Sequence, residues 1–253
     1  MEHPFSRTEL LLGPWVLERL SKAHVAVFGI GGVGGYAVEA LVRSGIGAID
    51  LIDNDRVCVS NLNRQIIATR DTIGRYKVDV MEERIRSICP ETRVAAHHVF
   101  FLPETADRFD FSAYDYVIDA VDTVTAKLEL VIRSERAQVP VISCMGTGNK
   151  LDPSRLLIGD IYETSVCPLA RVMRRELRKR GVERLTVLYS TEEPLRPAGC
   201  GENPEGTGDG MGKRRAVPGS VSFVPSAAGL LIAARVVTEL ANMTGKEAEG
   251  EER

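Results

Sequence analysis

Residues 25–35 are Val25-Ala26-Val27-Phe28-Gly29-Ile30-Gly31-Gly32-Val33-Gly34-Gly35. The apolar run at its start indicates a buried strand, and the glycines that follow predict a tight turn. Residues 36–43 are compatible with a helix, which we expect Gly45 to cap at its C-terminus. A strand, a glycine turn and a helix in this order predict the first unit of a parallel α/β sheet.

The residues that follow continue this alternation of strands and helices. Further strands are predicted at residues 48–52, 94–98, 114–119 and 139–144. A helix is expected over residues 71–89, where Pro90 stops it, and another over residues 125–137. The pattern predicts an α/β fold with a Rossmann-like, mostly parallel sheet and helices on both faces.

The second half of the chain has a different character. We expect a strand at 156–161, a helix at 168–180 that Gly181 closes, and a strand at 185–190. Residues 194–219 contain four Pro and seven Gly, which predicts a mobile loop.

These elements predict one domain over residues 1–245. Its nucleotide-binding part spans about 20–150 and its substrate-binding part about 151–245. The segment 246–253 contains four Glu and is read as an acidic tail. The apolar stretch 221–234 predicts a strand followed by a core helix, because it is shorter than the roughly 20 residues that span a bilayer. We therefore expect no membrane partner.

The composition is that of a soluble globular protein. The 253 residues include 32 Lys and Arg against 35 Asp and Glu, giving a net charge of −3, and 44% are hydrophobic. These values exclude disordered, collagen-like and membrane classes. The first residues lack the basic start and apolar core of a secretory signal, so we expect a cytoplasmic protein. The five cysteines form no CxxC pair, which argues against a zinc site and a disulfide framework.

The glycine turn carries the first functional signal. Gly29, Gly31 and Gly34 form a GxGxxG motif, in which bare backbone and a helix N-terminus bind phosphate. Asp53 ends the next predicted strand, where a carboxylate can accept hydrogen bonds from a ribose. Taken alone, these residues favour a dinucleotide-dependent dehydrogenase over other nucleotide-binding proteins.

The segment after Asp53 favours a triphosphate instead. Residues 53–65 are polar and charged, whereas a nicotinamide needs a flat, mostly apolar slot. Arg64 and Lys77 add two cations, which suit a triphosphate better than a pyrophosphate that a helix dipole already serves. Each cation alone has an equal alternative: a surface salt bridge for Arg64 and a solvated helix position for Lys77.

Two carboxylates follow the strand predicted at 114–119. Ligands bind outside the carboxyl ends of parallel strands, so we expect Asp119 and Asp122 to project into the same crevice. A carboxylate that faces a triphosphate needs a divalent cation between them, which makes Asp122 a candidate Mg²⁺ ligand. Capping of the helix at 125–137 is an equal alternative for Asp119. The residues therefore predict ATP with Mg²⁺.

These motifs resemble those of the ubiquitin-activating-type adenylating enzymes, the ThiF, MoeB and HesA-like family. The resemblance covers residues 5–148 and includes Arg7 in the segment 5–13, the glycine turn, and Asn61-Leu62-Asn63-Arg64-Gln65. It implies an ATP site formed by Gly29, Gly31, Gly32, Gly34, Asp53, Asp55, Asn61, Arg64, Lys77 and Asp122. It further implies a homodimer in which Arg7 reaches the phosphates of the neighbouring subunit, and it makes Arg7, Arg64, Lys77 and Asp122 the catalytic residues.

The second half resembles one group within this family, the tRNA threonylcarbamoyladenosine dehydratases. Sulfur-carrier activators typically have two CxxC pairs, which this sequence lacks, whereas residues 145–153, 167–181 and 220–225 match the dehydratases. The resemblance implies that ATP is used to cyclise threonylcarbamoyladenosine in tRNA into an oxazolone. A cysteine-desulfurase partner and a monovalent cation, K⁺ or Na⁺, stay open, because backbone carbonyls can bind such an ion without leaving a motif.

A basic segment gives independent support for a tRNA substrate. Residues 171–184 contain seven Lys or Arg against two Glu. On a helical wheel the apolar side chains are Leu169, Val172, Met173 and Leu177, and the opposite face carries Arg171, Arg174, Arg175, Arg178 and Lys179. We predict that this face binds tRNA phosphates, with Lys213, Arg214 and Arg215 adding contacts; a merely solubilising face is the alternative.

Other functions stay open at this point. The first alternative is adenylation of the C-terminal glycine of a sulfur-carrier protein, the second a nucleotide-binding scaffold without chemistry, and the third a nicotinamide dehydrogenase. Cys144, Cys167 and Cys200 are potential thiol participants, although a small buried residue is the favoured reading of Cys144. His97 and His98 have no visible partner and are expected to be structural.

Overall fold

The structure is a computed structural model that describes residues 3–196 and 218–242. The predicted acidic tail, Cys200, Lys213, Arg214 and Arg215 lie outside the described residues, and so does most of the segment 194–219.

One seven-stranded sheet forms the centre of the fold, in the order β3-β2-β1-β4-β5-β7-β6. All neighbouring strands are parallel except β6 and β7. The strands are β1 (His24–Phe28), β2 (Ala48–Ile52), β3 (Arg93–His97), β4 (Tyr116–Asp119), β5 (Val141–Cys144), β6 (Leu156–Asp160) and β7 (Thr186–Ser190). The predicted α/β class and mostly parallel sheet are confirmed.

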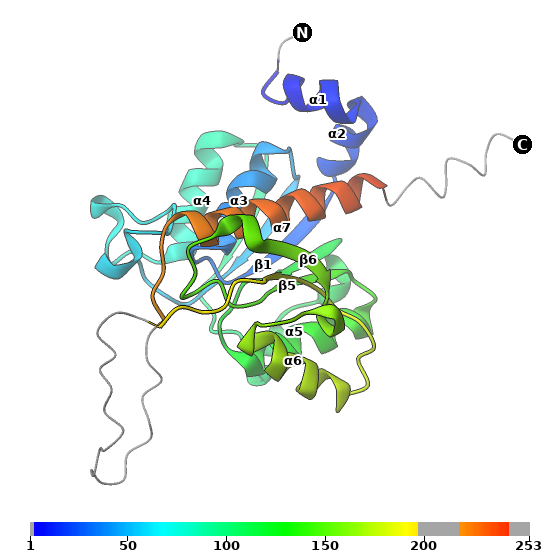
Figure 1. Cartoon of the computed structure of the whole chain (residues 1–253). Helices are drawn as coiled ribbons and strands as arrows, with labels where there is room; N and C mark the ends of the chain where they lie inside the picture. Colours follow the sequence, from blue (N-terminus) through cyan, green and yellow to red (C-terminus); the bar gives the residue numbers. More distant parts are fainter. Residues whose placement is uncertain (1–2, 197–217, 243–253) are drawn as a thin grey trace, which may run out of the picture.

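Helices cover both faces of this sheet (Figure 1). The α-helices are α1 (Ser6–Leu12), α2 (Pro14–Leu20), α3 (Gly34–Arg43), α4 (Lys77–Ile88), α5 (Val124–Ala137), α6 (Pro168–Arg178) and α7 (Phe223–Asn242). Short 3₁₀ turns are η1 (Val59–Asn61), η2 (Arg70–Thr72), η3 (Pro103–Arg108), η4 (Phe111–Ala113), η5 (Pro153–Arg155) and η6 (Ile161–Glu163). One core contains α3, α4 and α7, a second contains α5, and a third contains α5 and α6.

The strand order places a topological switch point at the carboxyl end of β1. The strand β1 pairs with β2 on one side and with β4 on the other. The sheet therefore continues from β1 in one direction through β2 and in the opposite direction through β4. In open α/β sheets, ligands bind at this switch point, outside the carboxyl ends of the strands. The glycine turn follows β1, and the residues after β4 lie directly beside it.

The helix expected over 71–89 begins later, at Lys77. Residues before it pair with the segment after β2 instead: Gly74 N–H donates to Val57 O at 2.8 Å, and Lys77 N–H donates to Asp55 O at 3.0 Å. Gly74 has φ +87°, which glycine adopts without strain. These long-range hydrogen bonds override the helical pattern of 71–76, and they bring Lys77 beside Asp55.

The strand expected after Val221 is absent from the described residues, and α7 begins at Phe223. This helix is long and apolar enough to cross a membrane by length and composition, and half of its apolar window is buried within the protein. It packs on α3 at close range, since a Cβ at Gly229 would lie 2.3 Å from Val33 O. The expectation of a core helix is confirmed.

Candidate functional site

The glycine turn after β1 fits its surroundings only without side chains. Gly29 has φ +90°, and a Cβ there would lie 2.7 Å from Ala120 O, in the turn after β4. A Cβ at Gly34 would lie 1.8 Å from Gly29 O. Gly34 also begins α3, so free N–H groups and the positive end of the helix dipole face the crevice. This arrangement suits a phosphate group.

Asp53 lies at the edge of this turn. Its Oδ2 accepts from Ile30 N–H and its Oδ1 accepts from Asp55 N–H, each at 2.8 Å. The side chain is only 10% exposed. Burial raises the pKa of Asp53 above its ordinary value, against the opposing effect of the Lys77 ammonium. A nearly buried carboxylate beside the turn agrees with the predicted ribose contact.

Lys77 joins this cluster from the first turn of α4. Its Nζ lies 2.7 Å from Asp55 Oδ2 and 3.7 Å from Asp53 Oδ2, and its side chain is 7% exposed. The alternative of a solvated lysine is therefore wrong. The structure brings together three predicted site residues, and it places an ammonium next to the phosphate-binding turn.

Arg64 approaches the turn from the loop that follows η1. Its guanidinium donates to Ser60 O at 2.7 Å and to Asn63 Oδ1 at 3.0 Å. Its Cγ lies 3.4 Å from the position of a Cβ at Gly32, so the arginine stem packs over the turn. Asn61 is buried and accepts from Cys58 N–H at 3.1 Å, which holds the loop in shape.

Gln65 is the last residue of the motif at 61–65. It is buried, and its Oε1 has no hydrogen-bond partner among the described residues. Its Nε2 lies 3.9 Å from the position of a Cβ at Gly31. Because buried polar atoms normally have partners, this amide is a further candidate contact for a bound ligand. The sequence gives no sign of this role, which follows from the missing hydrogen bond at the buried Oε1 atom.

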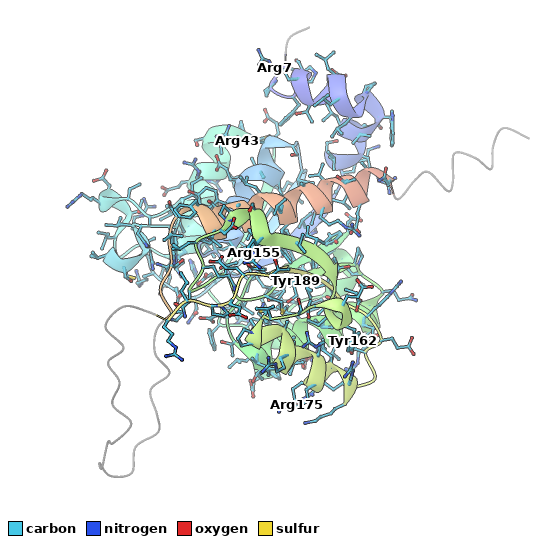
Figure 2. The ribbon with its side chains drawn as sticks, viewed as in Figure 1. Arg7, Arg43, Arg155, Tyr162, Arg175 and Tyr189 are labelled. Carbon is cyan, nitrogen blue, oxygen red and sulfur yellow. The ribbon has the colours of Figure 1, made fainter. Side chains whose placement is uncertain are left out.

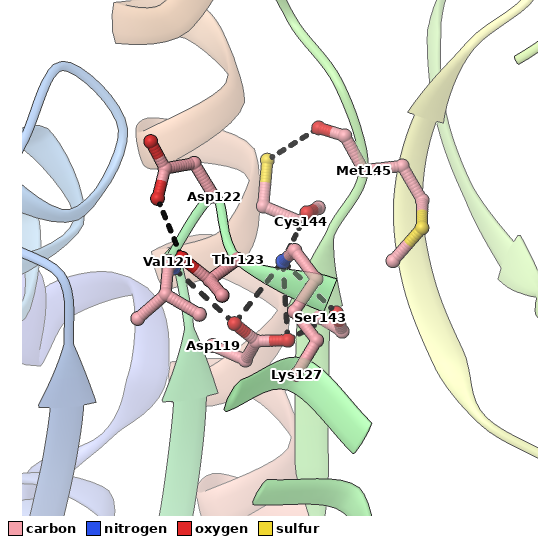
Figure 3. A network of polar contacts seen from close by, with 8 residues as sticks. All are labelled: Asp119, Val121, Asp122, Thr123, Lys127, Ser143, Cys144 and Met145. Carbon is pink, nitrogen blue, oxygen red and sulfur yellow. Dashed lines mark hydrogen bonds and ion pairs between the residues drawn. The ribbon is translucent and has the colours of Figure 1, made fainter. Parts of the chain in front are cut away.

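The two carboxylates after β4 do not share the crevice, which corrects the expectation for Asp119 (Figure 3). Asp119 is fully buried and pairs with Lys127 Nζ and Ser143 Oγ. It is therefore neither a crevice residue nor a simple helix cap. Asp122 is exposed, and its Oδ1 accepts from Thr123 Oγ1 at 3.3 Å.

The donor set fits Mg²⁺ that is carried largely by a nucleotide. Among the described residues, no group of three or more His, Cys, Asp or Glu is arranged to hold a metal ion. Mg²⁺ in phosphate-transfer sites usually keeps several waters and uses one or two carboxylates plus substrate phosphates. The exposed carboxylate of Asp122 supplies what such an ion needs from the protein.

Arg7 lies on α1, at the outer end of the molecule (Figure 2). None of the residues of α1 is buried, and Leu10 and Leu11 are 86% and 87% exposed. The side chain is exposed and is not part of the cluster around the glycine turn. Its predicted contact with a neighbouring subunit stays a prediction.

The basic face of α6 is partly tied to the protein. Arg174 donates to the carbonyl oxygen and hydroxyl of Thr164, and the guanidinium of Arg178 lies 5.1 Å from the centre of the Tyr162 ring. Arg171, Arg175 and Lys179 are exposed. The predicted apolar stripe needs one correction: Val172 is exposed, whereas Ala170, Met173 and Leu177 are buried and Leu169 packs partly buried against the same core.

An acidic residue holds the basic side chains of α6 together. Glu176 accepts from Lys179 and Arg180 at 3.0 Å and from Arg175 at 3.2 Å. Hydrogen bonds from Lys179, then Arg180 and Arg175, lower the pKa of Glu176 to about 2. It remains ionised at neutral pH and offsets part of the positive charge.

The described cysteines near β5 are poor nucleophiles. Cys144 and Cys167 are buried, and burial raises the pKa of the Cys144 thiol to about 12. Cys58, which the sequence did not single out, is exposed, and a hydrogen bond with Ser60 lowers its pKa. The favoured structural reading of Cys144 agrees with its burial.

The histidines have partners that the sequence did not reveal. His97 Nε2 lies 3.0 Å from Asp50 Oδ2, and His98 Nε2 lies 2.6 Å from Asp79 Oδ1. Asp50 is also bonded to His24 and Tyr114. These pairs link neighbouring elements and agree with a structural role.

The chain is similar to proteins already known. A family model described as ThiF family matches residues 5–251. A tRNA threonylcarbamoyladenosine dehydratase of Bacillus subtilis (strain 168) is 43% identical over 242 residues, covering 95% of each chain. The enzyme of the same name in Escherichia coli (strain K12) is 40% identical over 205 residues, or 78% of this chain and 76% of the relative.

Solved structures give the same picture. Crystal structures of E. coli tRNA N6-threonylcarbamoyladenosine dehydratase, TcdA, in complex with ATP and with AMP have TM-scores of 0.83 and 0.84. Each is 34% identical and covers 97% of this chain and 96% of the solved one. A sulfur carrier protein adenylyltransferase of Thermus thermophilus is 39% identical over 111 residues, only 44% of this chain.

Proposed function

We propose that this chain, which belongs to the ThiF family, uses ATP to dehydrate threonylcarbamoyladenosine in tRNA to its cyclic oxazolone form. The observation that carries the proposal is the similarity to dehydratases over 95% of both chains, which includes the substrate-binding half. The shared region with a sulfur-carrier adenylyltransferase is less than half of the chain. The same crevice also assembles phosphate-binding backbone, a ribose-type carboxylate and two cations.

Each residue of the crevice has a role in binding ATP. The N-terminus of α3 and the glycine turn bind phosphate, and Asp53 binds the ribose. Lys77 and Arg64 stabilise charge that develops on the phosphates, which is commonly the largest contribution to catalysis. Asp55 keeps Lys77 in place through the 2.7 Å contact, and Asn61 holds the loop that carries Arg64.

Asp122 is the residue that would hold Mg²⁺. Bound to the phosphates of ATP, the ion would neutralise their charge and favour departure of pyrophosphate. The protein's own contribution is to keep the Asp122 carboxylate exposed, outside the buried network below it. A monovalent cation, K⁺ or Na⁺, would require backbone carbonyls, and we assign no residues to it.

The chemistry needs no nucleophile from the protein. The threonyl carboxylate oxygen attacks the α-phosphorus of ATP, and pyrophosphate leaves. The neighbouring carbamoyl oxygen then attacks the activated carbonyl carbon, AMP leaves, and one proton is lost, so the net change is removal of water. Both nucleophiles belong to the tRNA, and holding them in place supplies much of the rate. Burial of Cys144 and Cys167 agrees with this course.

The partners follow from two exposed surfaces. The basic side chains of α6 would bind tRNA phosphates, joined by Lys213, Arg214 and Arg215. The apolar side chains Leu10, Leu11 and Trp15 would be covered by a second copy of the chain, which would bring Arg7 to the partner's crevice. We further propose a cytoplasmic location, and we leave a cysteine desulfurase as an untested partner.

The test is direct. The purified protein is incubated with ATP, Mg²⁺ and tRNA that contains threonylcarbamoyladenosine, and the nucleosides are analysed by mass spectrometry. We expect a product lighter by one water, together with AMP and pyrophosphate. ATP binding without this product would overturn the proposal. ATP–pyrophosphate exchange that depends on a sulfur-carrier protein and not on tRNA would favour the alternative function.

A further inference from the structure

A network without solvent contact lies beneath the turn that carries Asp122 (Figure 3). The side chains of Lys127 and Asp119 are both fully buried. Lys127 Nζ lies 3.1 Å from each carboxylate oxygen of Asp119 and donates to Cys144 O at 2.7 Å. Ser143 Oγ donates to Asp119 Oδ2 at 2.5 Å.

The network joins three elements at the carboxyl edge of the sheet. Asp119 ends β4, Ser143 and Cys144 end β5, and Lys127 belongs to the first turn of α5. Asp119 Oδ1 also accepts from Val121 N–H at 3.2 Å, so it holds the residue that precedes Asp122.

The same turn also contacts the phosphate-binding backbone. Ala120 N–H donates to Phe28 O at 2.8 Å. The carbonyl oxygen of Ala120 lies where a side chain at Gly29 would have to be. A shift of the turn after β4 would therefore move both Asp122 and the wall of the glycine turn.

Stability alone is a weak reason for a charged pair at this place. The loss of hydration of two buried charges roughly cancels their attraction, and an apolar pair of similar volume is often as stable. The pair does have an electrostatic consequence for the crevice. Lys127 compensates the charge of Asp119, so this carboxylate adds no repulsion to a bound triphosphate, and Asp122 is left as the exposed acid of the turn.

We propose that Lys127 and Asp119 are positioning residues, which fix the turn at 120–123 so that Asp122 meets the Mg²⁺ complex of ATP. This inference rests on the proposed function and extends it to residues that touch neither ATP nor the ion. In this proposal, the charged pair of Lys127 and Asp119 is needed for the part of ATP binding that depends on Mg²⁺.

The test compares the wild type with the double variant Lys127→Met/Asp119→Asn, which keeps the network neutral. ATP affinity is measured by calorimetry with and without Mg²⁺, and turnover is measured with modified tRNA. We expect the affinity for ATP alone to be unchanged. The factor by which Mg²⁺ increases the affinity for ATP should fall about tenfold, and kcat should fall about tenfold with an unchanged KM for tRNA. Lys22→Met, at an exposed ion pair with Glu18, is the matched control and should behave as wild type.

A lower melting temperature with an unchanged Mg²⁺ effect and unchanged kcat would overturn the inference, because the network would then only stabilise the fold. Should the double variant not fold, Ser143→Ala removes one hydrogen bond to Asp119, and we expect a loss of about threefold in the Mg²⁺ effect. The Mg²⁺ effect on ATP binding requires no tRNA. A wild type that binds Mg²⁺ and ATP without making the cyclic product therefore refutes the dehydratase and still tests the positioning role.

Discussion

Lys77 shows how a single residue depends on contacts that are distant in sequence. The sequence predicts a helix around it, over 71–89, but it shows neither that this helix begins at Lys77 nor which residues Lys77 contacts. The backbone of residues 74–77 pairs with the segment after β2, which sets the Lys77 ammonium 2.7 Å from Asp55. Buried in this way, the ammonium is held in one position, as its proposed role in stabilising phosphate charge requires.

Arg64 provides the residue-level prediction. Arg64→Ala removes a cation that packs over the glycine turn, so we expect kcat to fall by about 10²–10³-fold. Affinity for tRNA should stay unchanged, as measured by filter binding in the absence of ATP. Arg70→Ala, at an exposed arginine of η2, is the matched control and should retain full turnover. Weaker tRNA binding by Arg64→Ala would show that this arginine contacts the nucleic acid instead.

At the scale of elements, α6 carries two kinds of basic residue, those that contact neighbouring segments and those that are exposed. Arg174 and Arg178 contact Thr164 and Tyr162, and they fasten the helix to η6. Arg171, Arg175 and Lys179 are exposed, and their charge is available for a long-range electrostatic contact. Arg175 and Lys179 also donate to Glu176 of the same helix. A helical wheel assigns these residues to one face, but only the contacts tell the fastening residues from the free surface.

The prediction for α6 therefore uses its exposed arginines. Arg171→Glu/Arg175→Glu should weaken tRNA binding and make it less dependent on salt, because fewer counterions are released. We expect a loss of about tenfold or more at physiological salt. The control Arg86→Glu/Arg93→Glu makes the same change of net charge at exposed arginines of α4 and β3. Equal effects of the two pairs would mean that net charge, rather than the face of α6, attracts tRNA.

At the scale of the whole molecule, Asp50 connects the three strands β3, β2 and β1 at one end of the sheet. From β2 it accepts hydrogen bonds from His24 of β1, His97 of β3 and Tyr114. Burial acts to raise the pKa of Asp50, but the hydrogen bonds from His24, His97 and Tyr114 outweigh it, and the pKa lies below its ordinary value of 3.8. A carboxyl group whose pKa is lower in the folded state stabilises that state at pH values above its pKa in the unfolded chain. This contribution is lost as the pH falls through the pKa of the folded state.

Asp50→Asn tests this contribution. At pH 7 we expect the variant to lose about 1–3 kcal/mol of unfolding free energy, because charged hydrogen bonds become neutral ones and a partner is left without an acceptor. The difference from wild type should stay constant down to about pH 4 and shrink below it. Urea unfolding of both proteins between pH 7 and pH 3 gives the measurement. A difference that stays the same at pH 3 would contradict an ionised Asp50 as its source.

The sequence by itself determined the local and periodic features of this protein. It predicted the α/β class, the glycine turn, the strand at 48–52, and the chemical types around the crevice, because apolar periodicity and glycine act within a few residues. Only the tertiary structure separated Asp119 from Asp122, tied Arg174 to Thr164 and gave His97 its partner. It also left Gln65 Oε1 without a partner among the residues that the structure describes. Burial, pairing and charge compensation depend on residues far apart in the chain, and folding alone decides which of them meet.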